Sequence, residues 1–190
     1  DVDSISRKLI LLNEKRKLIE NTVYDEALLQ VEKQKKNNFI LVYGHNWHNG
    51  ILGIVASRLI KKFYKPTIVI SFTNSIGVGS ARSIEYIDLG SIILNAKNQK
   101  LLIGGGGHKM AAGIQININS LDKFIKFLKI NINFISNNFF MKTEKFDSKL
   151  SVNEINNNLI EIIEKIEPFG AGNPEPKFII EDLNILKIQV

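Results

Sequence analysis

The sequence has no cysteine, and it contains only three histidines, four prolines and one tryptophan in 190 residues. The absence of cysteine excludes disulfides, thiolate zinc sites and cysteine nucleophiles. No apolar run reaches the roughly 20 residues that a membrane helix needs. The first residues also lack the pattern of a signal peptide. We therefore expect a cytoplasmic protein without a membrane partner.

Clustered acidic residues are missing as well. The acids Asp25, Asp88, Asp122 and Asp147 are scattered, and neither an Asp-His-His run nor a Ser/His/Asp arrangement is visible. Hard divalent cations need several oxygen ligands brought close together, and this sequence does not predict such a set. We expect no metal ligands in this chain, and no group of its own that cleaves a phosphodiester.

The residues that are present indicate a globular protein with basic character. Hydrophobic residues make up 44% of the sequence, charged residues 23%, and the formal net charge is +6. Lysine is abundant through compositional bias, so the charge is only a moderate indication of a polyanionic partner. Arginine occurs four times against 21 lysines. An arginine in this background suggests that a planar, bidentate fork was needed.

The first half of the sequence predicts a long helix followed by a strand–helix–strand unit. Apolar residues recur at near-helical spacing between residues 3 and 35. Short apolar runs at 39–44 and 67–72 predict buried strands, and 51–63 has the spacing of a helix that packs on a sheet. Such a βαβ unit implies parallel strands.

The pattern continues as an α/β unit that extends from about 38 to 135. Residues 76–84 predict a strand that leads into a loop, 87–96 a helix, 114–119 a half-exposed strand and 120–133 a helix capped by Ser120.

A second unit begins near Phe139. Residues 144–152 suggest a strand, 153–166 an amphipathic helix, 167–176 a Pro/Gly-rich turn and 177–190 further strands. So few elements would leave raw sheet edges and little core. Because the sequence also lacks an initial methionine, we expect a piece of a longer protein that ends partway through its second domain.

The segment "GGGGHKMAAG" (104–113) is the most unusual part of the sequence. Four glycines can adopt positive φ and turn successive N–H groups into an anion-binding nest. His108 would add a donor or a metal-ligand nitrogen beside it, and the small residues that follow could begin a short helix. The alternative is a flexible hinge with a surface histidine. The spacing matches neither a Walker loop nor a dinucleotide fingerprint.

A second motif, "GVGSARS" (77–83), predicts a phosphate clamp. Ser80 and Arg82 would leave an extended strand on the same face, so that a hydroxyl lies beside a guanidinium, with Ser83 nearby. In the alternative interpretation Arg82 is structural and pairs with Glu85 or Asp88.

A third motif, "GHNWHNGILGIVASRL" (44–59), joins a strand to a helix. His45 and His48 are three residues apart, but two imidazoles alone make a poor metal site. We expect His48 to face a substrate or to be structural at the helix entry, Trp47 to pack in a core or between domains, and Arg58 to be a structural pairing residue.

Together with "EPFGAGNPEPKF" (167–178), these motifs closely resemble the C-terminal half of the RecJ family, the bacterial single-strand-specific 5′→3′ DNA exonucleases of the DHH phosphoesterase superfamily. The glycine–histidine motif is shared across DHH-associated domains. The "EPFGAGNPEP" motif is the one that points to RecJ, since it opens the OB fold there.

The resemblance implies an α/β, βαβ-containing DHH-associated domain at 38–138. A connecting helical segment at 1–37 would precede it, and the beginning of a truncated, OB-type β domain would follow at 139–190. Catalysis would use two Mn²⁺ or Mg²⁺ ions held by an N-terminal DHH domain, which precedes this sequence. This fragment alone would be inactive. The full-length protein would be a hydrolase of DNA repair and recombination.

Residue by residue, the resemblance assigns the terminal 5′ phosphate of a single-stranded DNA to Ser80 and Arg82. It places Gly105, Gly106 and Gly107 along the cleft, with His108 near the scissile phosphate as the one catalytic residue. The alternative function is a nucleic-acid-binding DHH-associated module of an oligoribonuclease or a tRNA-related protein, without nuclease activity.

Overall fold

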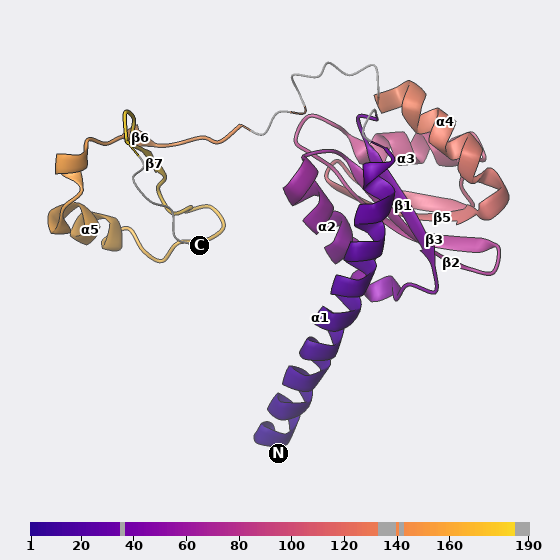
Figure 1. Cartoon of the computed structure of the whole chain (residues 1–190), viewed down its shortest axis with the longest axis horizontal. Coiled ribbons are helices and arrows are strands. Elements are labelled where there is room, and N and C mark those ends of the chain that lie inside the picture. Colours follow the sequence, from indigo (N-terminus) through magenta and orange to yellow (C-terminus); the bar gives the residue numbers. More distant parts are fainter. Residues whose placement is uncertain (35–36, 133–139, 141–142, 185–190) are drawn as a thin grey trace. The chain divides into compact units, whose positions relative to one another are not determined.

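The computed structural model describes residues 1–34, 37–132, 140 and 143–184, and it divides into two compact units (Figure 1). The first unit comprises Asp1–Lys142 and the second Thr143–Val190. The boundary that the sequence placed between 138 and 139 lies outside the described residues.

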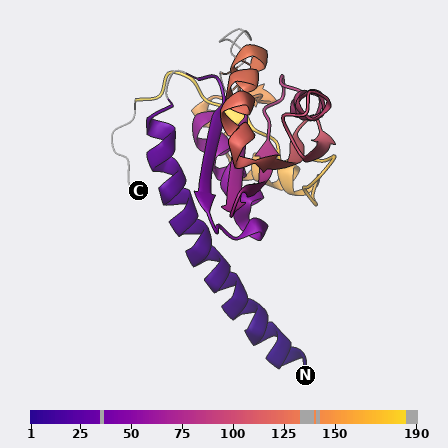
Figure 2. The ribbon, with the colours of Figure 1, turned by 90° about the vertical axis from the view of Figure 1, so that its right-hand side faces the viewer.

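The first unit begins with the long helix α1, Val2–Glu32, which Asp1 caps through its side chain. Its C-terminal part buries Val23, Ala27 and Val31 against the rest of the unit. Its N-terminal half extends past the sheet (Figures 1 and 2) and is exposed. Within the described ranges, no helix has the length and apolar character needed to cross a membrane.

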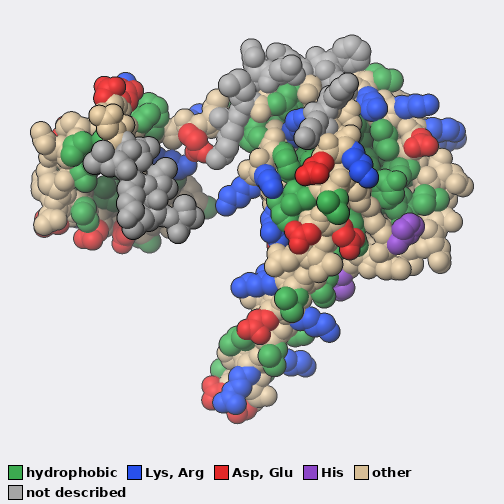
Figure 3. Space-filling view, viewed as in Figure 1, with side chains coloured by type: hydrophobic (Ala, Val, Ile, Leu, Met, Phe, Trp, Pro, Cys, Tyr) green, Lys and Arg blue, Asp and Glu red, His purple; other side chains and the backbone are tan. Residues whose placement is uncertain are grey.

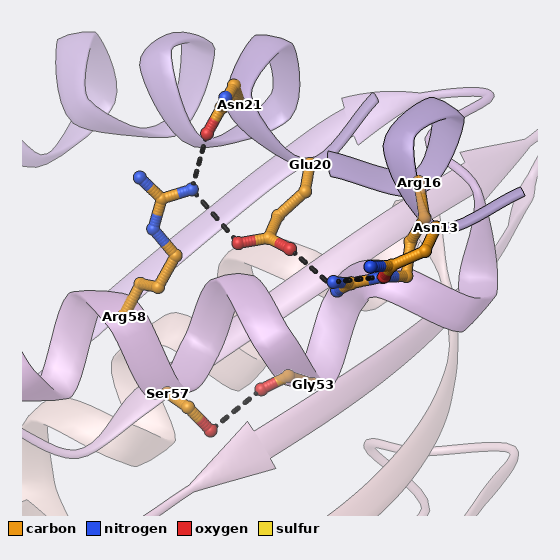
Figure 4. A network of polar contacts seen from close by, with 7 residues as sticks. All are labelled: Asn13, Arg16, Glu20, Asn21, Gly53, Ser57 and Arg58. Atoms are coloured by element: carbon orange, nitrogen blue, oxygen red, sulfur yellow. Dashed lines mark hydrogen bonds and ion pairs between the residues drawn. The ribbon is translucent and has the colours of Figure 1, made fainter. Parts of the chain in front are cut away.

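A polar network attaches α1 to the neighbouring helix α2, Leu52–Phe63 (Figure 4). The largely buried carboxylate of Glu20 accepts from Arg16 at 2.9 Å and from Arg58 at 3.0 Å. The Arg58 guanidinium also donates to Asn21 and lies 3.9 Å from the ring centre of Tyr24. The prediction that Arg58 is a structural pairing residue is therefore confirmed.

The sheet has five strands in the order β1-β2-β3-β5-β4. Strands β1 (Ile40–His45) and β2 (Thr67–Thr73) are parallel and joined through α2, which confirms the predicted βαβ unit. Strand β3 (Ile76–Arg82) returns antiparallel beside β2. Strands β5 (Ala111–Asn117) and β4 (Gly104–His108) complete the sheet, both pairings being antiparallel.

The glycine stretch is strand β4 and forms a hairpin with β5. None of its four glycines has positive φ, so the predicted anion nest is wrong. The short helix expected to start in "MAAG" is also wrong, because Ala111–Asn117 is a strand. Small residues at 111–113 fit a flat sheet surface as readily as a helix, and pairing with both β3 and β4 favoured the strand.

The two faces of the sheet carry different cores. Helices α3 (Leu89–Asn98) and α4 (Leu121–Ile132) cover one face, where Phe72, Ile93, Ile114, Phe124 and Leu128 are buried together. On the other face, α1 and α2 bury side chains of β1 and β2 such as Val42 and Val69. Alternation along each strand sends neighbouring side chains to opposite cores.

Strand β1 lies at the edge of the sheet, and two glutamines of α1 cover its backbone. The Gln30 amide donates to the carbonyl of Tyr43 and accepts from its N–H, at 2.7 and 3.1 Å. Gln34 makes the same pair of bonds with Leu41, at 2.7 and 3.2 Å. A helical spacing of four residues, about 6 Å, matches two residues of a strand. The helix thus satisfies edge groups that would otherwise be open to strand pairing.

The second unit is small and has short elements. Strands β6 (Ser148–Lys149) and β7 (Phe178–Ile179) pair in parallel, and the helix α5 spans Asn157–Glu164. The predicted helix and turn are confirmed. The turn is closed by Gly170 and Asn173, which exchange backbone hydrogen bonds of 2.8 and 3.1 Å. Of the strands predicted over 177–190, the structure shows β7, and residues 185–190 lie outside the described residues.

Candidate nucleic-acid interface

One face of the sheet is only half covered. Among the described residues, helix α1 lies against β1 and helix α2 against β2 and β3, while no helix covers β5 and β4 on this face. The strand residues that point to this side are intermediate or exposed in β3, β5 and β4, whereas their neighbours on the other side of β3 and β5 are buried. We call this uncovered half the open face. Its residues are Ile76, Val78, Ser80, Arg82, Gly104, Gly106, His108, Ala111, Gly113, Gln115 and Asn117.

The strand register brings the two sequence motifs together on the open face. Arg82 is opposite Ala111, and Ala111 is opposite His108, so that these three residues form one row across the sheet. Ser80, Gly113 and Gly106 form the next row. Directly opposed residues share a face. Two strand spacings separate the backbones of Arg82 and His108, which is about 10 Å.

The glycines of the open face leave free space above the backbone. A Cβ added to Gly106 or to Gly113 would meet nothing within 4 Å, and neither residue has positive φ. Neither the backbone conformation nor internal packing therefore requires glycine at these two positions. Two adjacent glycines in a sheet remove side chains where another backbone or a ligand approaches closely.

The other two predicted cleft glycines have a packing reason. A Cβ on Gly105 would lie 2.9 Å from Ile93 and 3.3 Å from Leu102, both on the covered face. A Cβ on Gly107 would overlap the backbone of Ala111 and Ala112 within the hairpin. The structure thus brings Gly106 to the open face and turns Gly105 and Gly107 toward the hairpin and the core.

The Arg82 side chain lies beside Ser80, as the motif predicts. Its Nη1 donates to the Ser80 hydroxyl at 3.1 Å and to the carbonyl of Ala81 at 2.9 Å. No carboxylate within the described part of the chain pairs with Arg82, so the alternative of an ion pair with Glu85 or Asp88 is not what the structure shows. A guanidinium and a hydroxyl side by side form a donor set for a phosphate.

The N-terminal end of α2 borders this donor set. A Cβ on Gly53 would lie 2.7 Å from Nη2 of Arg82 and 3.1 Å from Oγ of Ser80. Glycine at this position allows the first turn of α2 to lie directly against the clamp. Leu52, the first residue of α2, donates its N–H to Asn49 of the preceding helical turn, so this end of α2 favours an anion through the partial positive charge of the helix N-terminus.

His108 ends β4 and is exposed at the edge of the open face. It lines a hollow of about 250 Å³ together with Gly106, Lys109 and residues at the start of α3. Asp88 caps α3 there, and hydrogen bonds from the Ser91 N–H and hydroxyl lower the pKa of its carboxyl. Gly90 lets α3 approach β4, because a Cβ there would lie 2.9 Å from the carbonyl of His108.

Ser83 does not lie on the open face. It is 4% exposed, its hydroxyl donates to the carbonyl of Ile87 at 2.7 Å, and its N–H donates to Met110. The structure contradicts the expected substrate contact of Ser83. Alternation explains this outcome, since the residue after Arg82 turns toward the opposite core.

The two remaining histidines lie at the end of β1 and in the loop that follows it. His48 accepts from the Gly50 N–H through Nδ1 at 3.1 Å and so caps the short helix η1, Asn49–Ile51. His45 packs against Phe72. Trp47 is 7% exposed and donates to Glu26 of α1 at 2.8 Å, which confirms its packing role. His48 thus makes a structural contact through Nδ1, while its side chain is exposed to solvent.

The described side chains do not gather into a metal-binding cluster. Among the residues that the structure describes, no three histidine, aspartate or glutamate side chains lie close enough to hold a metal ion. This part of the chain does not fit a two-metal centre.

Sequence reasoning missed Gly53, Gly113 and Gln115. Gly113 belongs to the glycine motif, and a hairpin that pairs residue 106 with residue 113 would have predicted that these two glycines lie side by side. Gly53 could not be connected to Arg82 without the tertiary structure, since 29 residues separate them.

Each of the two units contains a match to a known family model. Residues 36–133 match the family model described as the DHHA1 domain, and residues 146–190 match the RecJ OB domain. The chain belongs to the DHHA1 family. The order of its two domains corresponds to the C-terminal part of RecJ exonucleases, as the motifs predicted.

Curated relatives agree with this assignment. RecJ of Bacillus subtilis is 29% identical over 96% of this chain, and RecJ of Salmonella typhimurium is 28% identical over 92%. The chain spans 23% and 32% of the lengths of these two relatives. The crystal structure of Thermus thermophilus RecJ with Mn²⁺ superposes with a TM-score of 0.82 at 24% identity, and covers 93% of this chain and 26% of that one. This last likeness shows the fold.

Proposed function

We propose that this chain is the substrate-gripping and nucleic-acid-binding portion of a RecJ-type single-strand-specific 5′→3′ exonuclease of DNA repair and recombination. The observation that carries the proposal is the open face. It places an arginine–serine clamp, two adjacent bare glycines and a histidine on one surface. The relatives named above are single-stranded-DNA-specific exonucleases.

In this proposal each group has a distinct role. Arg82 and Ser80 bind the 5′-terminal phosphate, since they offer charge-assisted donors next to the N-terminal turn of α2. Gly106 and Gly113 have no side chains, so the single-stranded DNA can lie directly against the sheet. His108, about 10 Å from the clamp across the row, contacts a group further along the strand, near the scissile phosphate. His48, in the loop before α2, contacts the edge of the bound DNA. Gly105 and Gly107 allow close packing on the opposite side of β4 and so hold Gly106 in position.

Hydrolysis is assigned to a DHH domain preceding this chain. Mn²⁺ or Mg²⁺, as in the solved RecJ structures, would activate water there and stabilise the charge that develops. The exposed N-terminal half of α1 supports such a neighbour, since Val2, Ile5, Leu9 and Leu12 are each more than half exposed at helical spacing. Figure 3 shows hydrophobic side chains at the surface of this part of α1. Exposed apolar side chains on a helix, which here also include Ile10, Leu11 and Leu18, are typical of a surface that packs on another domain. The enzyme would act in the cytoplasm.

The test measures binding of the whole chain to single-stranded DNA with and without a 5′ phosphate. Wild type should bind the phosphorylated strand more tightly, and Arg82→Ala should remove this difference, a loss of roughly tenfold, as expected of a hydrogen bond to a charged group. Arg7→Ala, which removes an exposed arginine of α1, is the matched control. Binding should also weaken steeply with salt.

Two outcomes would contradict the proposal. Equal affinities of wild type and Arg82→Ala for the phosphorylated strand would exclude the clamp. Manganese-dependent degradation of DNA by the pure chain would show that the hydrolytic centre lies within it.

A further inference from the structure

The open face continues beyond the clamp and changes character. In the row after Ser80, Val78 is opposite Gln115, and Gln115 is opposite Gly104. Val78 is 40% exposed, and the next residue on the same face, Ile76, is 36% exposed. The surface that begins with a guanidinium and a hydroxyl therefore becomes apolar along β3.

Gln115 brings a polar group to this apolar surface. It is exposed, and a Cβ on Gly104 would lie 3.5 Å from its Oε1. The amide therefore extends over the bare backbone of β4. Within the described ranges, no protein group forms a hydrogen bond with it. Both its donor and its acceptor remain available to a ligand.

The loop before α2 lies beside this row. Ser71 of β2 is paired with Val78 of β3, and the Ser71 hydroxyl donates to the carbonyl of Trp47 at 2.7 Å. Gly44, paired with Ser71, has no room for a Cβ because the Trp47 ring lies on it. The packed tryptophan and its loop thus border the apolar surface on the side of β2.

The spacing of the rows suits one nucleotide. Ser80 and Val78 are two residues apart on one strand, a distance of about 6.8 Å. If a phosphate is bound at Ser80 and Arg82, the base of the same nucleotide can reach Val78 over this distance. An apolar floor with one amide at its margin has the composition of a small-ligand site, in which few polar groups fix the orientation.

We propose that Val78 and Gln115 form a subsite for the base of the nucleotide whose phosphate is bound by Arg82. This inference rests on the proposed function. The base packs on Val78, and the Gln115 amide donates to and accepts from its edge. A glutamine amide complements adenine in this way, so the subsite favours a 5′-terminal adenine.

The experiment compares short, 3′-labelled single-stranded DNAs that differ only in the 5′ nucleotide: phosphorylated adenosine, phosphorylated thymidine, or a phosphorylated abasic residue. Binding to the whole chain is followed by fluorescence anisotropy. Wild type should bind the adenosine strand about fivefold more tightly than the abasic strand, as expected for one or two net hydrogen bonds with apolar contact.

Gln115→Ala should reduce this preference to about twofold or less. Val78→Ser should lower the affinity for both the adenosine and the thymidine strand. Gln99→Ala, which truncates an exposed glutamine after α3, is the control and should retain the preference. Thermal unfolding of each variant verifies the fold.

The outcomes separate the two proposals. If Arg82→Ala weakens binding but Gln115→Ala and Val78→Ser leave the base preference unchanged, the subsite is wrong and the clamp stands. If wild type binds the abasic and adenosine strands equally, the subsite is also wrong. If neither the 5′ phosphate nor Arg82 affects affinity, the proposed function itself fails.

Discussion

Two neighbouring glycines of β4 should respond to the same substitution in opposite ways. Gly106→Ala adds a methyl group where no atom lies within 4 Å. Its backbone is in an extended strand without positive φ, which alanine adopts without strain. The substitution also removes conformational freedom from the unfolded chain. We expect the free energy of unfolding to be unchanged or raised by up to about 1 kcal/mol.

Gly107→Ala places the same methyl group on the opposite side of the strand. The added carbon would overlap the carbonyl oxygen of Ala111 and the Cα of Ala112. Both are backbone atoms of the paired strand, so the hairpin itself has to move. Overpacking of this kind costs roughly 1–3 kcal/mol. The two variants should therefore differ in stability by at least about 1 kcal/mol, although their positions are consecutive.

Urea unfolding and DNA binding test this contrast together. Gly106→Ala should keep the unfolding midpoint of the first unit but bind single-stranded DNA several-fold more weakly, because the methyl group occupies space kept for the ligand. If Gly106→Ala is as destabilised as Gly107→Ala, the description of free space above Gly106 is wrong. If it is stable and binds DNA as wild type does, the open face is not the ligand surface.

Two further predictions concern stability and pH. The double variant Gln30→Ala/Gln34→Ala should lower the free energy of unfolding by about 2 kcal/mol or more, because four edge hydrogen bonds of β1 are exchanged for water. It should also self-associate, and a monomer in sedimentation at high concentration would contradict the edge-capping role. For Asp88, hydrogen bonds from Ser91 lower the pKa below the ordinary value of 3.8, so its stabilising contribution is present above that pH and is lost as the pH falls through the lowered pKa. The difference in melting temperature between wild type and Asp88→Asn should shrink below about pH 4, and a difference independent of pH would refute the assignment.

Local patterns predicted the elements of the first unit well. The apolar runs that became β1 and β2, and the helical spacing of α2, each depend on residues close in sequence, and burial on one or both sides enforces the same periodicity. The prediction failed at the glycine motif. Glycine and alanine fit a loop, a helix start and a strand equally, so no local preference decided among them. The pairing that made Ala111–Asn117 a strand is with β3, which is distant in the sequence, and β4 in turn pairs with β5.

For the site, the sequence alone determined the chemistry of the groups. A serine two residues before a scarce arginine places a hydroxyl and a guanidinium on one side of any extended strand, and the motifs were sufficient to identify the family. Only the tertiary structure decided which residues meet. The register placed Arg82 in one row with His108 and set Gly106 beside Gly113, and the packing of α2 on the sheet brought Gly53 against Ser80 and Arg82. Strand pairing and helix packing join residues that are distant in the chain, and their register depends on burying all the strands at once.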